Sequence, residues 1–196
     1  MASVANICNL AFSHFGHDAN VISIAPPDDS VEAQLCAQFY PIARDEALEE
    51  HAWTFATKRA TLAPLVSARE DFAYAYALPA DCLKPRKVLS EGYASDSESE
   101  VFEVEDQIIY TDVPSTASLV YTYTLTSTGK FSALFTVALS LKLASYLAGP
   151  ILKDATGRVQ ALLMQRAVFA LGKAKASDSN SDTKRSTRES TAARVR

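Results

Sequence analysis

The sequence has few of the residues on which most catalytic and ligand-binding motifs depend. Its 196 residues include six glycines, three cysteines and three histidines. There is no G-x-x-x-x-G-K, G-x-G-x-x-G or G-x-S-x-G motif, which excludes the common phosphate-binding loops and the nucleophile elbow of hydrolases. Cys8, Cys36 and Cys82 are widely spaced, odd in number and form no C-x-x-C pair. This usage makes no disulfide framework and favours a reducing compartment.

The three histidines do not form a catalytic or metal-binding pattern. His14 and His17 flank the point where the first helix is expected to end, whereas metal ligands need a stable frame and further ligands. His51 follows two glutamates at the end of an acidic helix, where a cation stabilises the helix C-terminus. We therefore predict no catalytic residue, no metal site, no cofactor and no enzymatic activity.

Two groups of acidic residues are candidate cation sites. The first spreads over more than one helix face, lacks an E-x-x-H pattern and consists of Asp45, Glu46, Glu49 and Glu50. The second lacks the glycine and register of a calcium loop and consists of Asp96, Glu98, Glu100, Glu103, Glu105 and Asp106. We predict a solvated helix face for the first group, and for the second a hairpin tip or a patch that meets a basic partner. In the latter case the residues that contact the partner would be Glu98, Glu100, Glu103 and Glu105.

The spacing of apolar residues predicts helices in both halves of the chain. Apolar residues recur every three or four positions over about 2–15, 29–51, 131–148 and 152–175. Asp28, Asp29 or Ser30 would begin the second helix, and Pro41 would kink or break it. Gly149-Pro150 would end the third. The apolar face of the fourth would consist of Leu152, Ala155, Val159, Leu162, Leu163, Arg166 and Phe169.

Residues of about 53–126 have the alternating pattern of short strands. Extended segments are expected at 53–57, 74–78, 86–89, 101–105, 107–111 and 119–125. The fold class predicted from these patterns is mainly α with a β insertion. A four-helix bundle body would carry a small antiparallel β unit of four to six strands, and residues 1–175 would form one domain.

The longest apolar stretch, residues 131–152, does not read as a membrane span. It carries Lys142 near its middle, several Ser and Thr residues, and Gly149-Pro150 near its end. A span of about 20 mostly apolar residues seldom includes such a charge. We therefore expect a buried helix and no membrane partner.

The charge of the chain changes sign near its end. Residues 1–172 carry twelve Lys/Arg and twenty Asp/Glu, a net −8, whereas residues 173–196 carry seven and three, a net +4. Residues 176–196 contain one large apolar residue, so we expect an extended tail that is ordered only when neighbouring proteins hold it. Its cations would pair with an acidic protein surface or with phosphates. The residues expected to dock are Lys184, Arg185, Arg188, Arg194, Val195 and Arg196.

Two strings in the first half of the chain resemble a known family. One is CAQFYPIARDEALEEHAWTFATKRATLAPL, with its W-x-F-A element, and the other is FAYAYALPADCLKPRKVL, with its Y-x-L-P-x-D element. Together they resemble the head-to-tail adaptor proteins of short-tailed bacteriophages, the tail tubular protein A type. The similarity covers most of residues 2–172, and its motifs are loose.

The resemblance implies a structural virion protein at the head-tail junction, assembled in the host cytoplasm. It implies a dodecameric homo-oligomeric ring that joins the portal protein to the tail nozzle protein and forms part of the conduit for double-stranded DNA during genome ejection. It also implies that the C-terminal tail docks on the portal. Under this resemblance, the acidic residues Glu98, Glu100, Glu103 and Glu105 would contact a neighbouring subunit or the tail nozzle. The alternative is a small DNA-binding or packaging accessory protein that acts through its basic tail.

Overall fold

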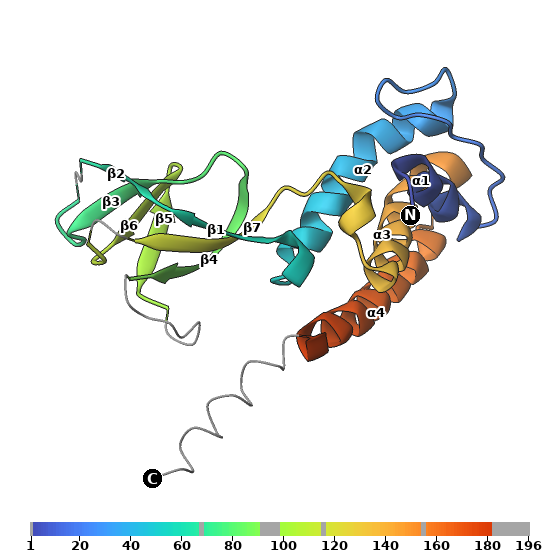
Figure 1. Ribbon diagram of the computed structural model, residues 1–196. Helices are drawn as coiled ribbons and strands as arrows, with labels where there is room; N and C mark the ends of the chain where they lie inside the picture. The colour runs from blue at the N-terminus through green and yellow to red at the C-terminus, as the bar shows by residue number, and fades with distance from the viewer. Residues whose placement is uncertain (1, 67–68, 91–98, 115–116, 154–155, 182–196) are drawn as a thin grey trace, which may run out of the picture. The chain divides into compact units, whose positions relative to one another are not determined.

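The computed structural model describes residues 2–66, 69–90, 99–114, 117–153 and 156–181, which belong to two compact units (Figure 1). The helical unit is built from the segment up to Phe55 together with the segment from Thr126 onward. The β unit is the continuous segment Ala56–Leu125. The β unit is therefore inserted into the chain of the helical unit.

The prediction of a mainly α protein with a four-helix bundle body is wrong. The described part of the chain is mixed α/β, with 47% helix, 22% strand, four α-helices and two antiparallel sheets. The physical reason is that the insertion has apolar cores of its own, in which Tyr76, Ile109 and Leu119 are fully buried. Alternation along the sequence marks single strands, but it does not show that they pair into two separate sheets.

The first two helices of the helical unit begin at serine caps. α1 (Val4–Ser13) follows Ser3 and α2 (Val31–Glu49) follows Ser30, and each serine hydroxyl accepts a backbone N–H of the first turn. Pro41 lies inside α2 without ending it. Because Pro41 is on the exposed face of α2, its ring projects away from the core, and the helix loses one backbone hydrogen bond.

The other two helices extend beyond their expected ends. α3 (Ala133–Leu152) continues through Gly149-Pro150 and ends at Lys153, which has a left-handed φ of 52°. A proline this close to the end of a helix removes one bond near the last turn. α4 (Arg158–Ser181) starts later than expected and includes residues 176–181, which were expected in the extended tail.

The two sheets of the β unit are entirely antiparallel. The three-stranded sheet has the order β1-β7-β4 and contains β1 (Thr57–Thr61), β7 (Ser118–Tyr123) and β4 (Cys82–Leu89). The four-stranded sheet has the order β2-β3-β6-β5 and contains β2 (Ala63–Leu65), β3 (Tyr74–Ala77), β6 (Ile108–Thr111) and β5 (Phe102–Glu105). β5 is thus an edge strand of its sheet.

The strand expected at 53–57 is not formed. Trp53 is fully buried and its Nε1–H donates to the carbonyl of Ala47 at 2.9 Å. A 3₁₀ helix, η1 (Thr54–Ala56), follows, and β1 begins only at Thr57. The anchored indole therefore holds this segment in the helical unit, although its alternating pattern resembles that of a strand.

α3 is the central helix of the helical unit and contacts α1, α2 and α4 (Figure 1). Among the described residues, it is the one helix whose length and mean hydropathy would allow it to cross a membrane, and 61% of its most apolar window is buried within the protein. Contacts with three neighbouring helices account for that apolar composition.

Candidate interaction surface

Side chains of α3 and α4 line an open apolar groove of about 580 Å³. We call it the α3/α4 groove; its lining includes Leu134, Val137 and Leu141 from α3 and Gln165, Arg166, Phe169 and Lys173 from α4. Phe169 is 66% exposed and Leu134 45% exposed. Apolar side chains gathered in this way on a surface mark interaction sites, whereas single exposed apolar residues are ordinary.

α4 carries apolar residues on two stripes, and the second stripe contributes Phe169 to the groove. One stripe is buried and consists of Leu163, Ala167, Leu171 and Ala174. The second stripe includes Leu162, which is 48% exposed, and Phe169. The apolar face predicted from the sequence combined Leu162, Arg166 and Phe169 with the truly buried Leu163, and was wrong in that respect. Two apolar stripes on one helix were the signal that this helix has a second surface to cover.

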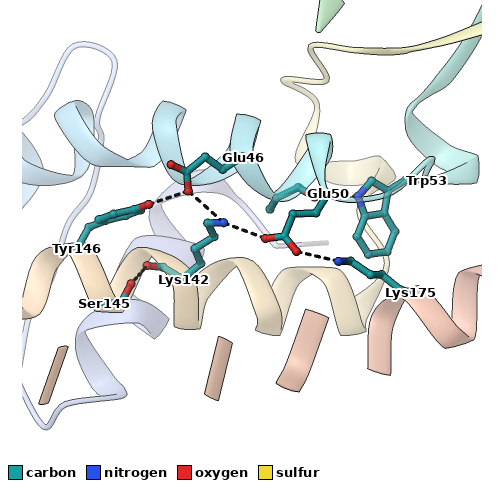
Figure 2. Close-up of polar contacts among 8 residues, drawn as sticks. Glu46, Glu50, Trp53, Lys142, Ser145, Tyr146 and Lys175 are labelled. Atoms are coloured by element: carbon teal, nitrogen blue, oxygen red, sulfur yellow. Dashed lines mark hydrogen bonds and ion pairs between the residues drawn. The ribbon is translucent and has the colours of Figure 1, made fainter. Parts of the chain in front are cut away.

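A buried lysine connects α2 and α3 within the same unit (Figure 2). The Lys142 side chain is 9% exposed, and its Nζ lies 3.0 Å from both Glu46 Oε2 and Glu50 Oε1. Lys175 of α4 approaches the other oxygen of Glu50 at 2.8 Å, and the Tyr146 hydroxyl donates to Glu46 at 2.6 Å. The acidic group predicted to be a solvated helix face therefore includes two carboxylates that pair with lysines of other helices.

The hydrogen bonds in this network hold both carboxylates in the charged form. Burial alone would raise the pKa of Glu46, but hydrogen bonds from Tyr146 and Lys142 outweigh it, and the pKa is lowered. Burial would also raise the pKa of Glu50, but hydrogen bonds from Lys175 and Lys142 outweigh this effect, and the pKa is lowered. Burial and the bond to Glu46 raise the pKa of Tyr146 to about 12. The lysines, the carboxylates and the Tyr146 hydroxyl are bound to one another, so the network stabilises the unit.

The histidines have structural partners. His14 Nε2 lies 2.9 Å from Ser140 Oγ, a distance compatible with a base and a nucleophile. Ser140, however, is fully buried and its hydroxyl donates to the carbonyl of Val137. Burial, and then the charge of Arg166, lower the pKa of His14. The pair therefore joins α1 to α3 and has no access to a substrate.

His17 and His51 each lie beside a carboxylate. His17 Nε2 is 3.0 Å from Glu32 of α2. His51 Nε2 is 3.4 Å from Asp178 of α4, and its ring packs edge-on against Trp53. His51 thus contacts the end of another helix, in addition to following the C-terminus of α2 as the sequence suggested.

The predicted contact residues of the acidic hairpin are only partly placed. Glu103 and Glu105 lie on edge strand β5, with carboxylates 3.0 and 3.4 Å from Arg69. The backbone N–H of Glu100 donates to the carbonyl of Val88. Glu98 lies outside the described residues, as do all the docking residues predicted in the tail: Lys184, Arg185, Arg188, Arg194, Val195 and Arg196.

The aromatic residues that anchor the family resemblance, Trp53 and Tyr76, are fully buried. Trp53 packs against Phe55 and Phe135, and the hydroxyl of the fully buried Tyr76 donates to the carbonyl of Val113. Asp81 accepts from Tyr121 at 2.9 Å and pairs with Lys58. These contacts stabilise each unit from within, while the side chains of Lys58 and Asp81 are 45% and 42% exposed.

Comparison with known proteins does not assign the chain: no family model matches it, and no curated protein does either. Within the described residues, no group of three or more His, Cys, Asp or Glu side chains is placed to hold a metal ion. The α3/α4 groove is therefore the feature on which a functional argument is best built.

Proposed function

We propose that this protein is a structural subunit that assembles with copies of itself into a ring. The ring would serve as the head-to-tail adaptor of a short-tailed bacteriophage virion, between the portal protein and the tail nozzle protein. The observation that carries the proposal is the exposed apolar α3/α4 groove, because an apolar surface of this kind on a subunit is covered by assembly.

The packing of the helical unit supports a structural role. α3 is packed between α1, α2 and α4, and the Lys142 network ties α2 to α3 and α4. A stiff unit of this kind suits the wall of a ring, while loops and tails suit contacts with differently shaped neighbours. The net −8 of residues 1–172 suits a conduit through which DNA passes without adhering.

The resemblance in the W-x-F-A and Y-x-L-P-x-D strings supplies the identity of the ring. It implies twelve copies, a portal above, a nozzle below and a location in the virion. Because Trp53 and Tyr76, the aromatic residues of the two motifs, are fully buried, the motifs support a shared fold and leave the contacts with portal and nozzle to be found by experiment.

Imaging tests the proposal directly. The purified full-length chain is examined by electron microscopy and native mass spectrometry, alone and after addition of a portal ring. Closed rings, formed alone or on the portal, support the adaptor. A protein that stays monomeric in both conditions contradicts it.

Removal of the basic end separates the adaptor from the DNA-binding alternative. The deletion should cover residues 182–196 and spare residues up to Ser181, because Asp178 is bound to Thr54. Loss of portal binding with unchanged DNA affinity supports the adaptor. Loss of a strongly salt-dependent DNA affinity supports the accessory protein.

A further inference from the structure

The α3/α4 groove combines an apolar floor with two cations. Leu134, Val137 and Phe169 supply apolar side chains, and Arg166 and Lys173 also line it. The ammonium of Lys173 lies 4.5 Å from the ring centroid of Phe169. Within the described part of the chain, no carboxylate forms an ion pair with either cation. An occupant of the groove should therefore present apolar side chains beside carboxylates.

The N-terminal part of the helical unit has the opposite charge. Residues 1–43 contain no Lys or Arg, and their acids are Asp18, Asp28, Asp29 and Glu32. Glu32 pairs with His17, and Asp28 accepts hydrogen bonds within its own loop. Asp18 and Asp29 are exposed and form no ion pair with any described residue. Two carboxylates here thus match the two cations of the groove.

The loop between α1 and α2 presents apolar side chains beside these acids. Ile22 is 75% exposed, and Val31, the first residue of α2, is 62% exposed. The Asp28 carboxylate holds the two positions close together. One of its oxygens accepts from the backbone N–H of Ile22 at 2.9 Å, and the other accepts from that of Ser30 at 3.0 Å. We call Ile22, Asp29 and Val31 the α1/α2 knob.

Hydrogen bonds fix the shape of this loop before any partner binds. Asn9 of α1 bonds to both the N–H and the carbonyl of Val21, at 2.8 and 3.0 Å. The hydroxyl of Ser30 donates to Asp28 and accepts from Ala33. The bonds from Ser30 and Ile22 lower the pKa of Asp28 to about 2, so its carboxylate is charged at neutral pH. A preformed surface loses little conformational entropy when it docks.

A single copy does not bring these two surfaces together. Among the described residues, the groove lining contains no residue of the α1/α2 knob or of the loop that carries it. Ile22 and Val31 stay largely exposed, as does Phe169 in the groove. Both surfaces belong to the helical unit, so each is available to a different neighbouring copy.

From this arrangement we infer that the α3/α4 groove of one copy holds the α1/α2 knob of the next copy. Ile22 and Val31 would meet the apolar floor, and Asp29 would face the cations. The inference rests on the proposed ring and names its lateral contact. Two different surfaces of the same chain meet in such a contact, which is heterologous and closes into a ring when the rotation between subunits permits.

Disulfide cross-linking between copies tests the contact directly. The Cys82→Ser chain serves as the background, because Cys8 and Cys36 are fully buried. Val31→Cys in one preparation and Ala170→Cys, in the groove lining, in another should give a cross-linked dimer when they are mixed and oxidised. Neither preparation should cross-link alone. Val168→Cys, at a 61% exposed position outside the lining, replaces Ala170→Cys in the control and should give no cross-link to Val31→Cys.

Charge exchange tests the electrostatic part. Asp29→Lys should raise the dissociation constant for self-association about tenfold, since it loses an attraction and adds a repulsion. Combined with Arg166→Glu or with Lys173→Glu, whichever cation faces Asp29, it should recover most of the wild-type affinity. Sedimentation equilibrium measures each constant, and thermal unfolding shows whether each variant folds.

Apolar variants supply matched controls and a test of direction. Phe169→Ser and Ile22→Ser should each weaken association about tenfold or more. Val168→Ser and Ile42→Ser, at exposed positions outside the groove lining and the knob, should leave it unchanged. Phe169→Asp and Ile22→Asp should each block assembly alone. Their equimolar mixture should stop at dimers, because only one intact groove and one intact knob can meet.

The outcomes separate the contact from the proposed function. Rings that persist in Phe169→Ser and Ile22→Ser, or that form without the Val31→Cys to Ala170→Cys cross-link, overturn the contact and leave the ring standing. Loss of rings in Phe169→Ser with no effect of Ile22→Ser assigns the groove to a different occupant and also overturns the contact. A wild-type chain that is monomeric both alone and with a portal overturns contact and ring together.

Discussion

Lys142 joins three helices through charges that come from distant parts of the sequence. Its Nζ bridges Glu46 and Glu50 of the α2 segment, and Glu50 in turn binds Lys175 of α4. The side chains of Glu46 and Glu50 are 46% and 34% exposed, so water screens part of the interaction. A contribution well below that of a fully buried ion pair is therefore expected.

Replacement of the ammonium tests this contribution. Lys142→Met keeps most of the side-chain volume but leaves two carboxylates without their shared cation. We expect the free energy of unfolding at pH 7 to fall by about 1–3 kcal/mol, less than for a fully buried pair. Urea unfolding measured by the emission of Trp53, the single tryptophan, gives the value. An unchanged urea midpoint in Lys142→Met would contradict the expected loss of stability.

The same network predicts an acid-sensitive contribution to stability. The pKa of Glu50 is lowered from its ordinary value near 4.5 in the folded state. Its contribution is therefore fully present above the unfolded pKa and is lost as pH falls through the folded pKa. The difference in unfolding free energy between wild type and Glu50→Gln should shrink as the pH is lowered from 6 to about 3. Glu105→Gln, at a carboxylate that is 70% exposed, serves as the control and should differ little from wild type at any pH.

The cysteines provide a second test of burial. Cys8 and Cys36 are fully buried, and their mutual hydrogen bond, followed by burial, raises the pKa of Cys36. Burial and then Asp81 raise the pKa of the half-buried Cys82 to about 11. A thiol reagent at pH 8 should modify only Cys82 in the native protein, on the order of a hundredfold more slowly than unfolded thiols, because the thiolate is the reactive form. Cys82→Ser should abolish thiol modification of the folded protein. Rapid modification of all three thiols would contradict the burial of Cys8 and Cys36.

The end of α4 shows what the sequence pattern could and could not predict. Residues 176–181 contain no large apolar side chain, so they were assigned to an extended tail. In the structure Asp178 accepts bonds from the backbone N–H and the hydroxyl of Thr54, at 3.0 and 2.7 Å. Thr54 is 124 positions away. A polar contact over that separation leaves no periodic signal, whereas the buried stripe of Leu163, Ala167 and Leu171 does.

The same limit applies to the strands and to the groove. The alternation of apolar and polar residues located the strand segments around Tyr76 and Ile109. The division into two sheets, however, depends on pairing between strands that are far apart in the sequence. The apolar residues of α4 could be identified, yet their division between core and groove depends on where α3 lies. Composition and motifs could exclude common catalytic loops, and they could not locate the groove.

Shortening α4 tests whether its end is part of the folded unit. A chain that ends at residue 176 loses Asp178, and we expect its unfolding free energy to fall by about 1–3 kcal/mol, since the polar groups of Thr54 lose their partner. A chain that ends at Ser181 keeps the contact and should match the full-length protein. Asp178→Ala should reproduce most of the loss, and equal urea midpoints for both truncations would contradict the anchoring role.

The β unit is one continuous segment whose first and last strands pair with each other, so it can be deleted and replaced by a short linker. Thr57 of β1 pairs with Thr122 of β7, so the chain enters and leaves the β unit on neighbouring strands, with paired Cα atoms about 5.5 Å apart or less. The aromatic cluster around Trp53 and the Lys142 network both lie within the helical unit. A linker of about four residues, which spans up to roughly 14 Å, should therefore be able to replace residues 57–124.

We expect the chain without its β unit to fold and to assemble like the full-length protein, because the α3/α4 groove belongs to the helical unit. The emission maximum of Trp53 and the helical circular dichroism report folding, and native mass spectrometry reports assembly. Folded but monomeric protein would show that the β unit supplies an essential subunit contact. Phe169→Ser in this shortened chain should weaken assembly about as much as in the full-length protein, because the same groove is altered in both.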